Sequence, residues 1–298
     1  MNEGVLAGLG AYLLWGLFPI YWKWLQTVPA LQILGHRMVW SLIFVAGLLV
    51  LQRDRAWLGA ALRQRKTLLV YTLAALLLSG NWFIYIWAVN AGYIVETSLG
   101  YFINPLVNVL LGVVLLKEKL RRAQAGAALL AGLGVLYLTF DYGRLPWIAL
   151  ALAFSFATYG LLKKTAPLNS TRSFTLETLV MFLPAVAYLV FQELNGVGAF
   201  GHQSGRVTLL LVLAGPVTSV PLILFGIAAR RIPLSMIGFL QYLAPTLQFL
   251  IGVYIFRESF PPSRLLGFSL IWMALVVYSL DSVLSSRKKA NMAGASGD

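Results

Sequence analysis

The chain of 298 residues contains no cysteine, only two histidines and few acidic residues. Without cysteine, disulfide frameworks, thiolate catalysis and thiol-ligated zinc are all excluded. His36 and His202 are too few to build a histidine-based metal cluster. The chain also lacks a Gly-rich phosphate-binding loop or another nucleotide motif. We therefore expect no metal site and no cofactor.

Charge is scarce as well. Charged residues make up 11% of the chain, while hydrophobic residues make up 59%. A soluble protein carries about 25% charged residues, so a water-facing globule is excluded. Intrinsic disorder is excluded too, because it needs low hydrophobicity. The composition predicts a protein that crosses a membrane several times.

The hydrophobic residues fall in ten continuous runs separated by charged or turn residues. Each run is long enough for one α-helix to cross the ~30 Å hydrocarbon core of a bilayer. A membrane β-barrel would instead show alternation in segments of about ten residues. The sequence therefore predicts an all-α polytopic membrane protein with ten transmembrane helices. These helices are expected at about 5–22, 31–51, 68–89, 94–116, 123–140, 145–162, 174–191, 207–228, 234–256 and 265–284.

Lys and Arg are distributed unevenly between the two sides of these runs. Of the 23 basic residues, 17 fall on one side, five fall on the other, and Arg37 lies within a run. Lys163 is counted here with the loop that follows the sixth run. Because cytoplasmic loops are enriched in Lys and Arg, we predict both termini in the cytoplasm. This bias explains the basic charge of the chain, so we expect no nucleic-acid partner.

A repeat with an offset of 140 residues relates the two halves of the chain. The aligned pairs include Lys23 and Lys163, Pro105 and Pro245, Gly112 and Gly252, and Glu118 and Glu258. Each copy holds five runs, so the second copy enters the membrane from the opposite side, as in the inverted repeats of secondary transporters. We expect an N-terminal five-helix repeat over 1–140, an inverted C-terminal repeat over 141–284 and a disordered cytoplasmic tail over 285–298.

Several short motifs stand out along the runs. They are His36-Arg37, Gly80-Asn81-Trp82, Ser98-Leu99-Gly100-Tyr101-Phe102-Ile103-Asn104-Pro105, Ala153-Phe154-Ser155-Phe156-Ala157, and Gln241-Tyr242 with Pro245-Thr246-Leu247. In these motifs the chain resembles the RarD family, in the EamA branch of the drug/metabolite transporter superfamily. The resemblance covers roughly residues 4–285. It implies a bacterial inner-membrane permease built from two EamA-like halves, and the family name is associated with chloramphenicol sensitivity.

Polar side chains inside the runs are the candidates for a central site, because a polar group in hydrocarbon must be paired or face water. Tyr101, Asn104 and Asn108 share one face of the fourth helix. Gln241 and Gln248 lie on the corresponding helix of the second half, and both helices contain a proline. Two interrupted helices at corresponding positions indicate a binding site. The alternative is that these amides only join helices through hydrogen bonds.

Aromatic residues and one further amide are candidates for the same cavity. Asn81 and Tyr85 share a face of the third helix, while Trp15 and Tyr159 lie in the first and sixth helices. Aromatic walls suit flat or amphipathic organic solutes. The alternative is an interfacial belt, in which Trp and Tyr lie at the membrane surface.

Arg37 and Glu177, which are among the charged residues within the runs, are related by the repeat offset. Arg37 lies about 9 Å from the periplasmic start of its helix, and Glu177 lies near the cytoplasmic start of its own. Their depths argue against a direct ion pair. Arg37 is a candidate for holding an anionic group, and Glu177 is a candidate for proton or cation coupling. For each, the alternative is a side chain that reaches the near interface.

Glu118 and Glu258 each end a long run. A carboxylate at such a position can cap the following helix or hold a tight turn between helices. The stretch 126–132 is rich in Gly and Ala, which suits close helix packing within the chain or in a homo-oligomer.

Together these features predict a secondary transporter of the inner membrane for a small organic solute such as a metabolite or drug. A proton or substrate gradient would supply the energy, and transport would alternate around a cavity between the repeats. The expected partners are the solute and the lipid bilayer. The alternatives are an integral-membrane enzyme, which would need a nucleophile–base pair or a metal cluster that the sequence lacks, and a non-transporting scaffold or sensor.

Overall fold

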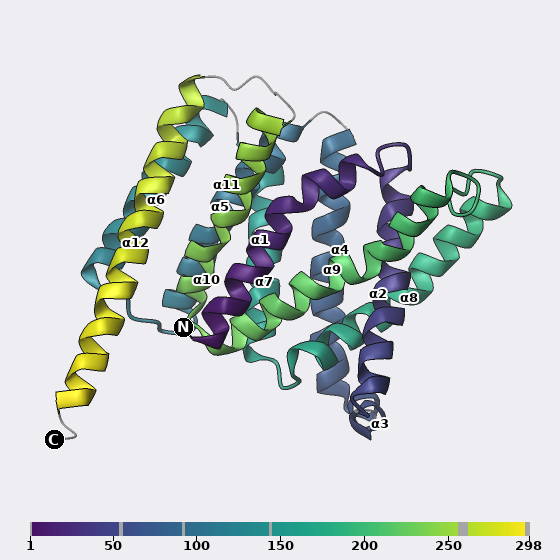
Figure 1. Ribbon diagram of the computed structural model, residues 1–298, viewed down its shortest axis with the longest axis horizontal. Coiled ribbons are helices and arrows are strands. Elements are labelled where there is room, and N and C mark those ends of the chain that lie inside the picture. The colour runs from purple at the N-terminus through teal and green to yellow at the C-terminus, as the bar shows by residue number, and fades with distance from the viewer. Residues whose placement is uncertain (1, 54–55, 91–92, 143–144, 256–261, 296–298) are drawn as a thin grey trace.

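A computed structural model describes residues 2–53, 56–90, 93–142, 145–255 and 262–295, and all secondary structure in these ranges is helical (Figure 1). The first half contains α1 (Glu3–Lys23), α2 (Ala30–Leu51), α3 (Ala56–Arg63), α4 (Arg65–Asn90), α5 (Ile94–Val114) and α6 (Arg122–Tyr142). The second half contains α7 (Trp147–Thr165), α8 (Ser170–Leu194), α9 (Gly205–Arg231), α10 (Leu234–Gln241), α11 (Leu243–Leu250), the π-helical turn η1 (Ile251–Ile255) and α12 (Pro262–Ala295).

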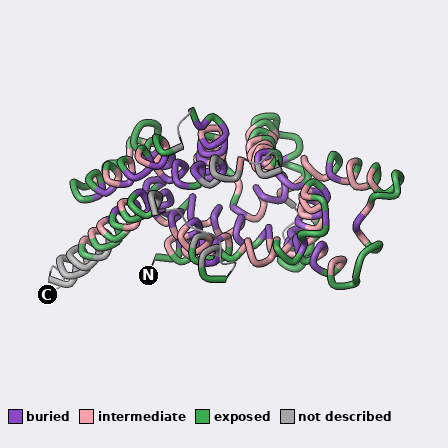
Figure 2. Tube along the Cα trace, turned by 90° about the horizontal axis from the view of Figure 1, so that it is seen from above, coloured by how far each residue is buried: buried purple, intermediate pink, exposed green. Residues whose placement is uncertain are grey.

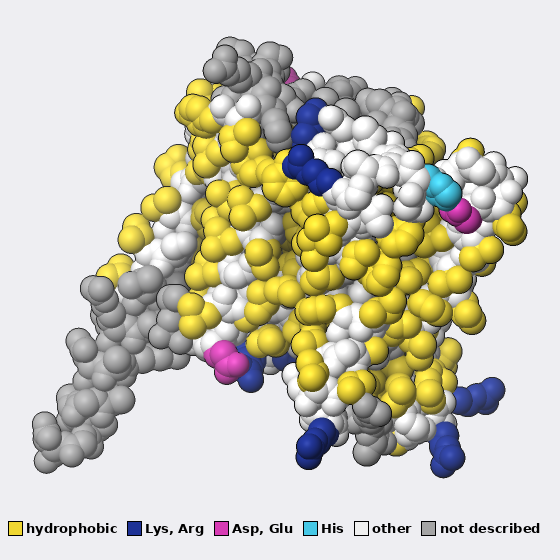
Figure 3. Space-filling model, turned by 45° about the vertical axis from the view of Figure 1, so that its right-hand side comes forward, with side chains coloured by type: hydrophobic (Ala, Val, Ile, Leu, Met, Phe, Trp, Pro, Cys, Tyr) yellow, Lys and Arg dark blue, Asp and Glu magenta, His cyan; other side chains and the backbone are white. Residues whose placement is uncertain are grey.

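The outer surface of the helix bundle is apolar. Hydrophobic side chains cover the middle of the face in Figure 3, and Lys and Arg lie toward its two ends. Within the described residues, six helices are long and apolar enough to cross a membrane, and α5 and α12 contribute the shorter apolar stretches Leu99–Val114 and Leu265–Asp281. An apolar band bounded by basic ends is typical of helices that face lipid. The chain is therefore a multi-pass membrane protein.

The ninth predicted helix is interrupted in the structure. It is divided into α10, α11 and η1, with a break at Tyr242. Proline is tolerated in the first turn of a helix, where its missing N–H has no intrahelical acceptor. Because α11 restarts at Leu243, Pro245 lies within such a first turn. Pro105, its counterpart in the repeat, lies inside the continuous helix α5.

Two segments differ from the sequence prediction. The loop over 52–67 contains the short helix α3, whose Trp57 and Leu58 pack against Tyr71 and Leu176. The tail over 285–298 was expected to be disordered, but α12 continues to Ala295. Extending a formed helix costs little per residue compared with starting one, which accounts for the continuation. Residues 296–298 lie outside the described ranges.

The helices of the two halves interlock. α2 packs against α8 and α9, α1 against α9 and α11, α5 against α7 and α10, and α6 against α12. Figure 2 shows buried residues toward the interior of the bundle and exposed residues around its rim. The contact between α2 and α9 is especially close, because a Cβ added to Gly215 would lie 2.4 Å from the carbonyl carbon of Trp40.

Candidate functional site

A small cavity lies between helices of the two halves. α2 and α4 of the first half and α8 and α9 of the second half line it. Its polar lining consists of Ser41, Ser79, Trp82, Glu177, Thr178 and Thr218. The cavity volume is about 10 Å³, which is room for about one water molecule. Small-molecule sites have a similar mixture of apolar walls and a few converging polar groups but are usually about 300–1,000 Å³, so in this conformation the cavity is too small for an organic solute.

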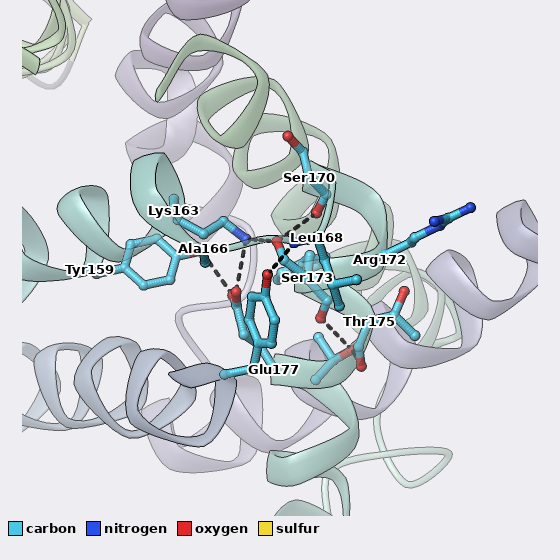
Figure 4. Close-up of polar contacts among 12 residues, drawn as sticks. Tyr159, Lys163, Ala166, Leu168, Ser170, Arg172, Ser173, Thr175 and Glu177 are labelled. Atoms are coloured by element: carbon cyan, nitrogen blue, oxygen red, sulfur yellow. Dashed lines mark hydrogen bonds and ion pairs between the residues drawn. The ribbon is translucent and has the colours of Figure 1, made fainter. Parts of the chain in front are cut away.

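Glu177 in the wall of this cavity forms a buried ion pair with Lys163. The Lys163 Nζ lies 2.8 Å from Glu177 Oε1, and the two side chains are 1% and 2% exposed. Lys163 Nζ also donates to Ser173 Oγ at 2.5 Å, and the Tyr159 hydroxyl donates to Glu177 Oε2 at 3.0 Å. Figure 4 shows these side chains converging from α7 and α8. The cluster satisfies both charges inside the protein, as a buried ion pair requires.

This ion pair corrects two parts of the sequence interpretation. Lys163 was counted with a cytoplasmic loop, but it is buried in α7. The alternative that Glu177 reaches the interface is wrong, because its side chain is enclosed by the protein. The sequence did contain a signal for the cluster. Tyr159 and Lys163 are four residues apart on one helix, as are Ser173 and Glu177, so each pair shares a helix face.

Arg37 lies near the same cavity but does not pair with Glu177, as the different depths of the two residues in the membrane predict. Its Nε donates to the Thr218 hydroxyl at 2.9 Å. Its guanidinium carbon lies 4.1 Å from the ring centroid of Trp82 and 4.8 Å from that of Trp22. The guanidinium is thus stacked near two indole rings while the residue remains half-buried. Stacking on aromatic faces is a common way to hold a guanidinium.

Two tyrosines extend this aromatic environment. The rings of Tyr85 and Tyr101 meet edge to face with centroids 5.8 Å apart. Their phenol groups, with that of Tyr21, lie close enough to Arg37 to interact with it electrostatically. Tyr101 keeps 39% of its surface exposed. Arg37, Tyr85 and Tyr101, all predicted site residues, therefore belong to one aromatic cluster around a guanidinium.

The predicted amides form a hydrogen-bonded network instead of lining the cavity. Asn108 Nδ2 donates to Asn104 Oδ1 at 3.0 Å and to Gln241 Oε1 at 2.9 Å. Asn104 Nδ2 donates to the carbonyl of Ala153 at 3.0 Å. All three amides are buried. The network joins α5 to α7 and α10, and Asn108 Oδ1 accepts no hydrogen bond from the residues that the structure describes.

Two further amides satisfy backbone or hydroxyl groups of neighbouring helices. Gln248 Nε2 donates to the carbonyl of Trp15 at 3.0 Å. That carbonyl lacks its helical partner, because the residue four positions later is Pro19, which has no N–H. Asn81 Nδ2 donates to the carbonyl of Leu152 and to Ser155 Oγ, both at 2.8 Å.

Trp15 and Tyr159 meet in a packed aromatic group. The rings of Trp15 and Phe156 have centroids 5.8 Å apart, and those of Tyr159 and Phe225 are stacked at 6.0 Å. Phe225 also contacts Trp15 at 5.7 Å. Tyr159 is fully buried and Trp15 is partly buried. The group therefore belongs to the core between α1, α7 and α9 and supports the Glu177 cluster through the Tyr159 hydroxyl.

Glu118 caps a helix, but not the one that follows it. Its Oε1 accepts from the backbone N–H of Leu234 at 2.7 Å, and its Oε2 accepts from the N–H and hydroxyl of Ser235 at 3.0 and 2.8 Å. These N–H groups belong to the first turn of α10, so the carboxylate meets the positive end of that helix dipole. Glu258, its counterpart in the repeat, lies outside the described residues.

Comparison with known proteins agrees with this architecture. The model of the EamA-like transporter family matches residues 2–140. The chain is 48% identical to Protein RarD of Streptomyces exfoliatus, over 96% of this chain and 91% of the relative. It is 46% identical to Uncharacterized transporter YojE of Bacillus subtilis, over 95% of each chain. Protein RarD of Escherichia coli is 40% identical, over 96% and 97%.

A solved crystal structure shares the fold. It superposes with a TM-score of 0.71 over 94% of this chain and 98% of the other, at 20% sequence identity. The helices, the apolar surface and the relatives together define a membrane transporter. The chain belongs to the EamA-like transporter family, and within it to the RarD-type permeases.

Proposed function

We propose that this permease is a secondary transporter of the bacterial inner membrane that moves a small organic solute by alternating access. The cavity between the halves is the observation that carries this proposal. Helices α2 and α4 line it from one half, helices α8 and α9 line it from the other, and a buried ion pair forms part of its wall. Movement of one half against the other would open this cavity to one side of the membrane at a time.

The packing of the helices supports two inverted repeats of five spans, over 1–140 and 141–284. Under the offset of 140 residues, α2 corresponds to α8, α5 to α10 and α11, and α6 to α12, and in each case the counterparts pack on each other. The contact of α1 with α9 likewise corresponds to the contact of α7 with α4. A two-fold axis between the halves accounts for this pattern, and it would let two mirror-related conformations have similar free energies.

Glu177 is the coupling group in this proposal. Its carboxylate lines the cavity and is neutralised by Lys163. Separating the two charges inside the protein is unfavourable unless another partner replaces one of them. A proton on Glu177 removes this attraction and leaves the Lys163 cation without its counterion, so protonation would favour a conformation in which Lys163 reaches water or another anion. Proton binding and opening of the cavity would then be linked.

The arrangement of the chain ends supports the proposed orientation. The N-terminal end, α3 and the end of α12 lie on the same side of the bundle in Figure 1. Under the positive-inside rule this is the cytoplasmic side, because the Arg-rich α2–α4 connection lies there. The names of the relatives favour transport over enzymatic catalysis. One relative, 32% identical and from Pseudomonas aeruginosa, is named Chloramphenicol-sensitive protein RarD, which makes chloramphenicol a suitable first probe.

Proteoliposomes containing the purified protein test the proposal. We expect saturable, protein-dependent flux of chloramphenicol or of a member of a metabolite panel, with accumulation when a pH gradient is imposed. Glu177→Gln should lose the gradient-driven accumulation and retain downhill flux. Glu193→Gln is the matched control, because Glu193 lies on the same helix but is exposed. Protein-dependent flux that is equal in wild type and Glu177→Gln under a pH gradient contradicts coupling through Glu177. The absence of any protein-dependent flux contradicts the proposed function.

A further inference from the structure

Arg37 carries a positive charge in a membrane-spanning helix without a carboxylate partner among the described residues. It lies in α2, seven positions after the start of that helix at Ala30. Thr218 is its one hydrogen-bond partner within the part of the chain that the structure describes, and only Nε takes part in that bond. A guanidinium has five N–H donors. Most of the donors of Arg37 are therefore available to water or to a ligand.

The aromatic rings around Arg37 fix its position without neutralising it. Trp22 and Trp82 contact the guanidinium, and Tyr85 and Tyr101 lie near it. Such rings attract a cation weakly and leave its N–H edge available for a bidentate contact. Trp82 also lines the cavity between the halves, as does Thr218. Arg37 therefore lies at the edge of the proposed transport cavity.

The repeat offset reveals a difference in charge between the two halves. The second half has Lys163 and Glu177, which form a neutral ion pair. At the corresponding positions the first half has Lys23, which is exposed at the end of α1, and Arg37, so a cation takes the place of the carboxylate. An anion that balances Arg37 would therefore come from outside the described residues. A charge at membrane depth is costly without such a counterion.

We propose that Arg37 is the recognition site for an organic monoanion, whose carboxylate binds the guanidinium and whose flat apolar body lies against the rings of Trp82, Tyr85 and Tyr101. This inference rests on the proposed transport function and specifies the class of its substrate. A planar carboxylate matches the fork of a guanidinium in a bidentate contact. A monoanion is favoured because one guanidinium balances one charge, and an organic cation would be repelled by it.

Binding measured without transport tests this inference separately from the proposed function. The probes are benzoate, its neutral analogue benzamide and its cationic analogue benzylamine, titrated against purified protein in lipid nanodiscs while tryptophan fluorescence and thermal stability are recorded. We expect saturable binding of benzoate at least about tenfold tighter than that of benzamide, a difference of about 1.4 kcal/mol. Benzylamine should be the weakest ligand. This comparison needs only the wild-type protein.

Two substitutions of Arg37 and one control locate the bound anion. Arg37→Gln should abolish the preference for benzoate over benzamide. Arg37→Lys should retain part of it, because the charge remains but the bidentate fork is lost. Arg206→Gln should bind like wild type, since Arg206 is exposed and its guanidinium carbon lies 5.6 Å from the Trp24 ring, outside the proposed site.

Three results would overturn the inference: no saturable benzoate binding by wild type, equal binding of benzoate and benzamide, or an unchanged preference in folded Arg37→Gln. Each of these can occur while the protein still transports a neutral solute in proteoliposomes, in which case the proposed function stands and the substrate class is wrong. Conversely, anion binding at Arg37 without any flux in proteoliposomes would support the binding site and contradict the proposed transport function.

Discussion

The buried ion pair between Lys163 and Glu177 predicts a specific pattern in a double-mutant cycle. The nitrogen and oxygen lie 2.8 Å apart, and the side chains are 1% and 2% exposed. Replacing one partner of such a pair leaves the other charge buried and unpaired, which typically costs about 3–5 kcal/mol. We expect Glu177→Gln and Lys163→Met each to lower the free energy of unfolding by about 3 kcal/mol.

The double variant should recover most of this loss. With Lys163→Met and Glu177→Gln together, no charge is left unpaired, and replacement of a buried pair by neutral residues is often close to neutral. With single losses of about 3 kcal/mol each and a double variant close to wild type, the interaction free energy from the cycle should be about 6 kcal/mol in size. Equilibrium unfolding of the four proteins in detergent micelles measures it.

An exposed contact between a histidine and a carboxylate provides the control for this cycle. His202 and Glu193 approach each other on the surface, where both side chains are more than half exposed. Glu193→Gln should change the free energy of unfolding by only about 0–1 kcal/mol. The reasoning is refuted if the single variants at Lys163 and Glu177 are as stable as wild type, or if the double variant loses the sum of their effects.

Three other substitutions test packing and capping, each by thermal unfolding in nanodiscs. Glu118→Gln removes one of two capping oxygens from α10 and should cost about 1 kcal/mol; an unchanged stability would show that the cap is dispensable. Gly215→Ala places a methyl group against the Trp40 backbone and should cost about 1–3 kcal/mol, whereas Gly126→Ala, with open space around it, should cost nothing from packing; equal effects of the two would contradict the close contact of α2 and α9. Gln248→Leu leaves the carbonyl freed by the proline of α1 without a donor and should cost about 1–3 kcal/mol; a gain in stability would show that water or a shift of the helix replaces the amide.

The class of fold follows from the sequence because the bilayer constrains it strongly. Runs of apolar residues long enough to cross hydrocarbon must be helical, since backbone groups have no other hydrogen-bond partners there. The separate partners of Arg37 and Glu177 were also predictable, because the rise per residue in a helix fixes their depth. These inferences use only local geometry and the thickness of the membrane.

Contacts between different helices were harder to predict from the sequence. Lys163 follows an apolar run directly, so its position resembled that of a loop residue, and the fold of α8 around it decides that it is buried. Glu118 caps a helix whose first residue is 116 positions later, a distance at which no local motif operates. Both cases depend on how separate helices pack, and the charge pattern of one helix contains little information about its neighbours.

The polar amides illustrate a third kind of ambiguity. Asn104, Asn108 and Gln241 occupy the helix face that a binding site would use, but they bond to one another and to a carbonyl of α7. A sequence distinguishes poorly between amides that bind a ligand and amides that join helices, because both functions need the same donors on the same face.

Accessibility of a single cysteine in the cavity tests alternating access most directly, and the natural chain contains no other cysteine. Ser79 lines the cavity, and its hydroxyl has no hydrogen-bond partner among the described residues, so Ser79→Cys introduces a thiol with little disturbance. A membrane-impermeant thiol reagent would be applied to right-side-out and inside-out vesicles, with and without a pH gradient. Alternating access predicts labelling from both sides, with a side preference that changes with the gradient. Labelling from one side only, whatever the gradient, would contradict it.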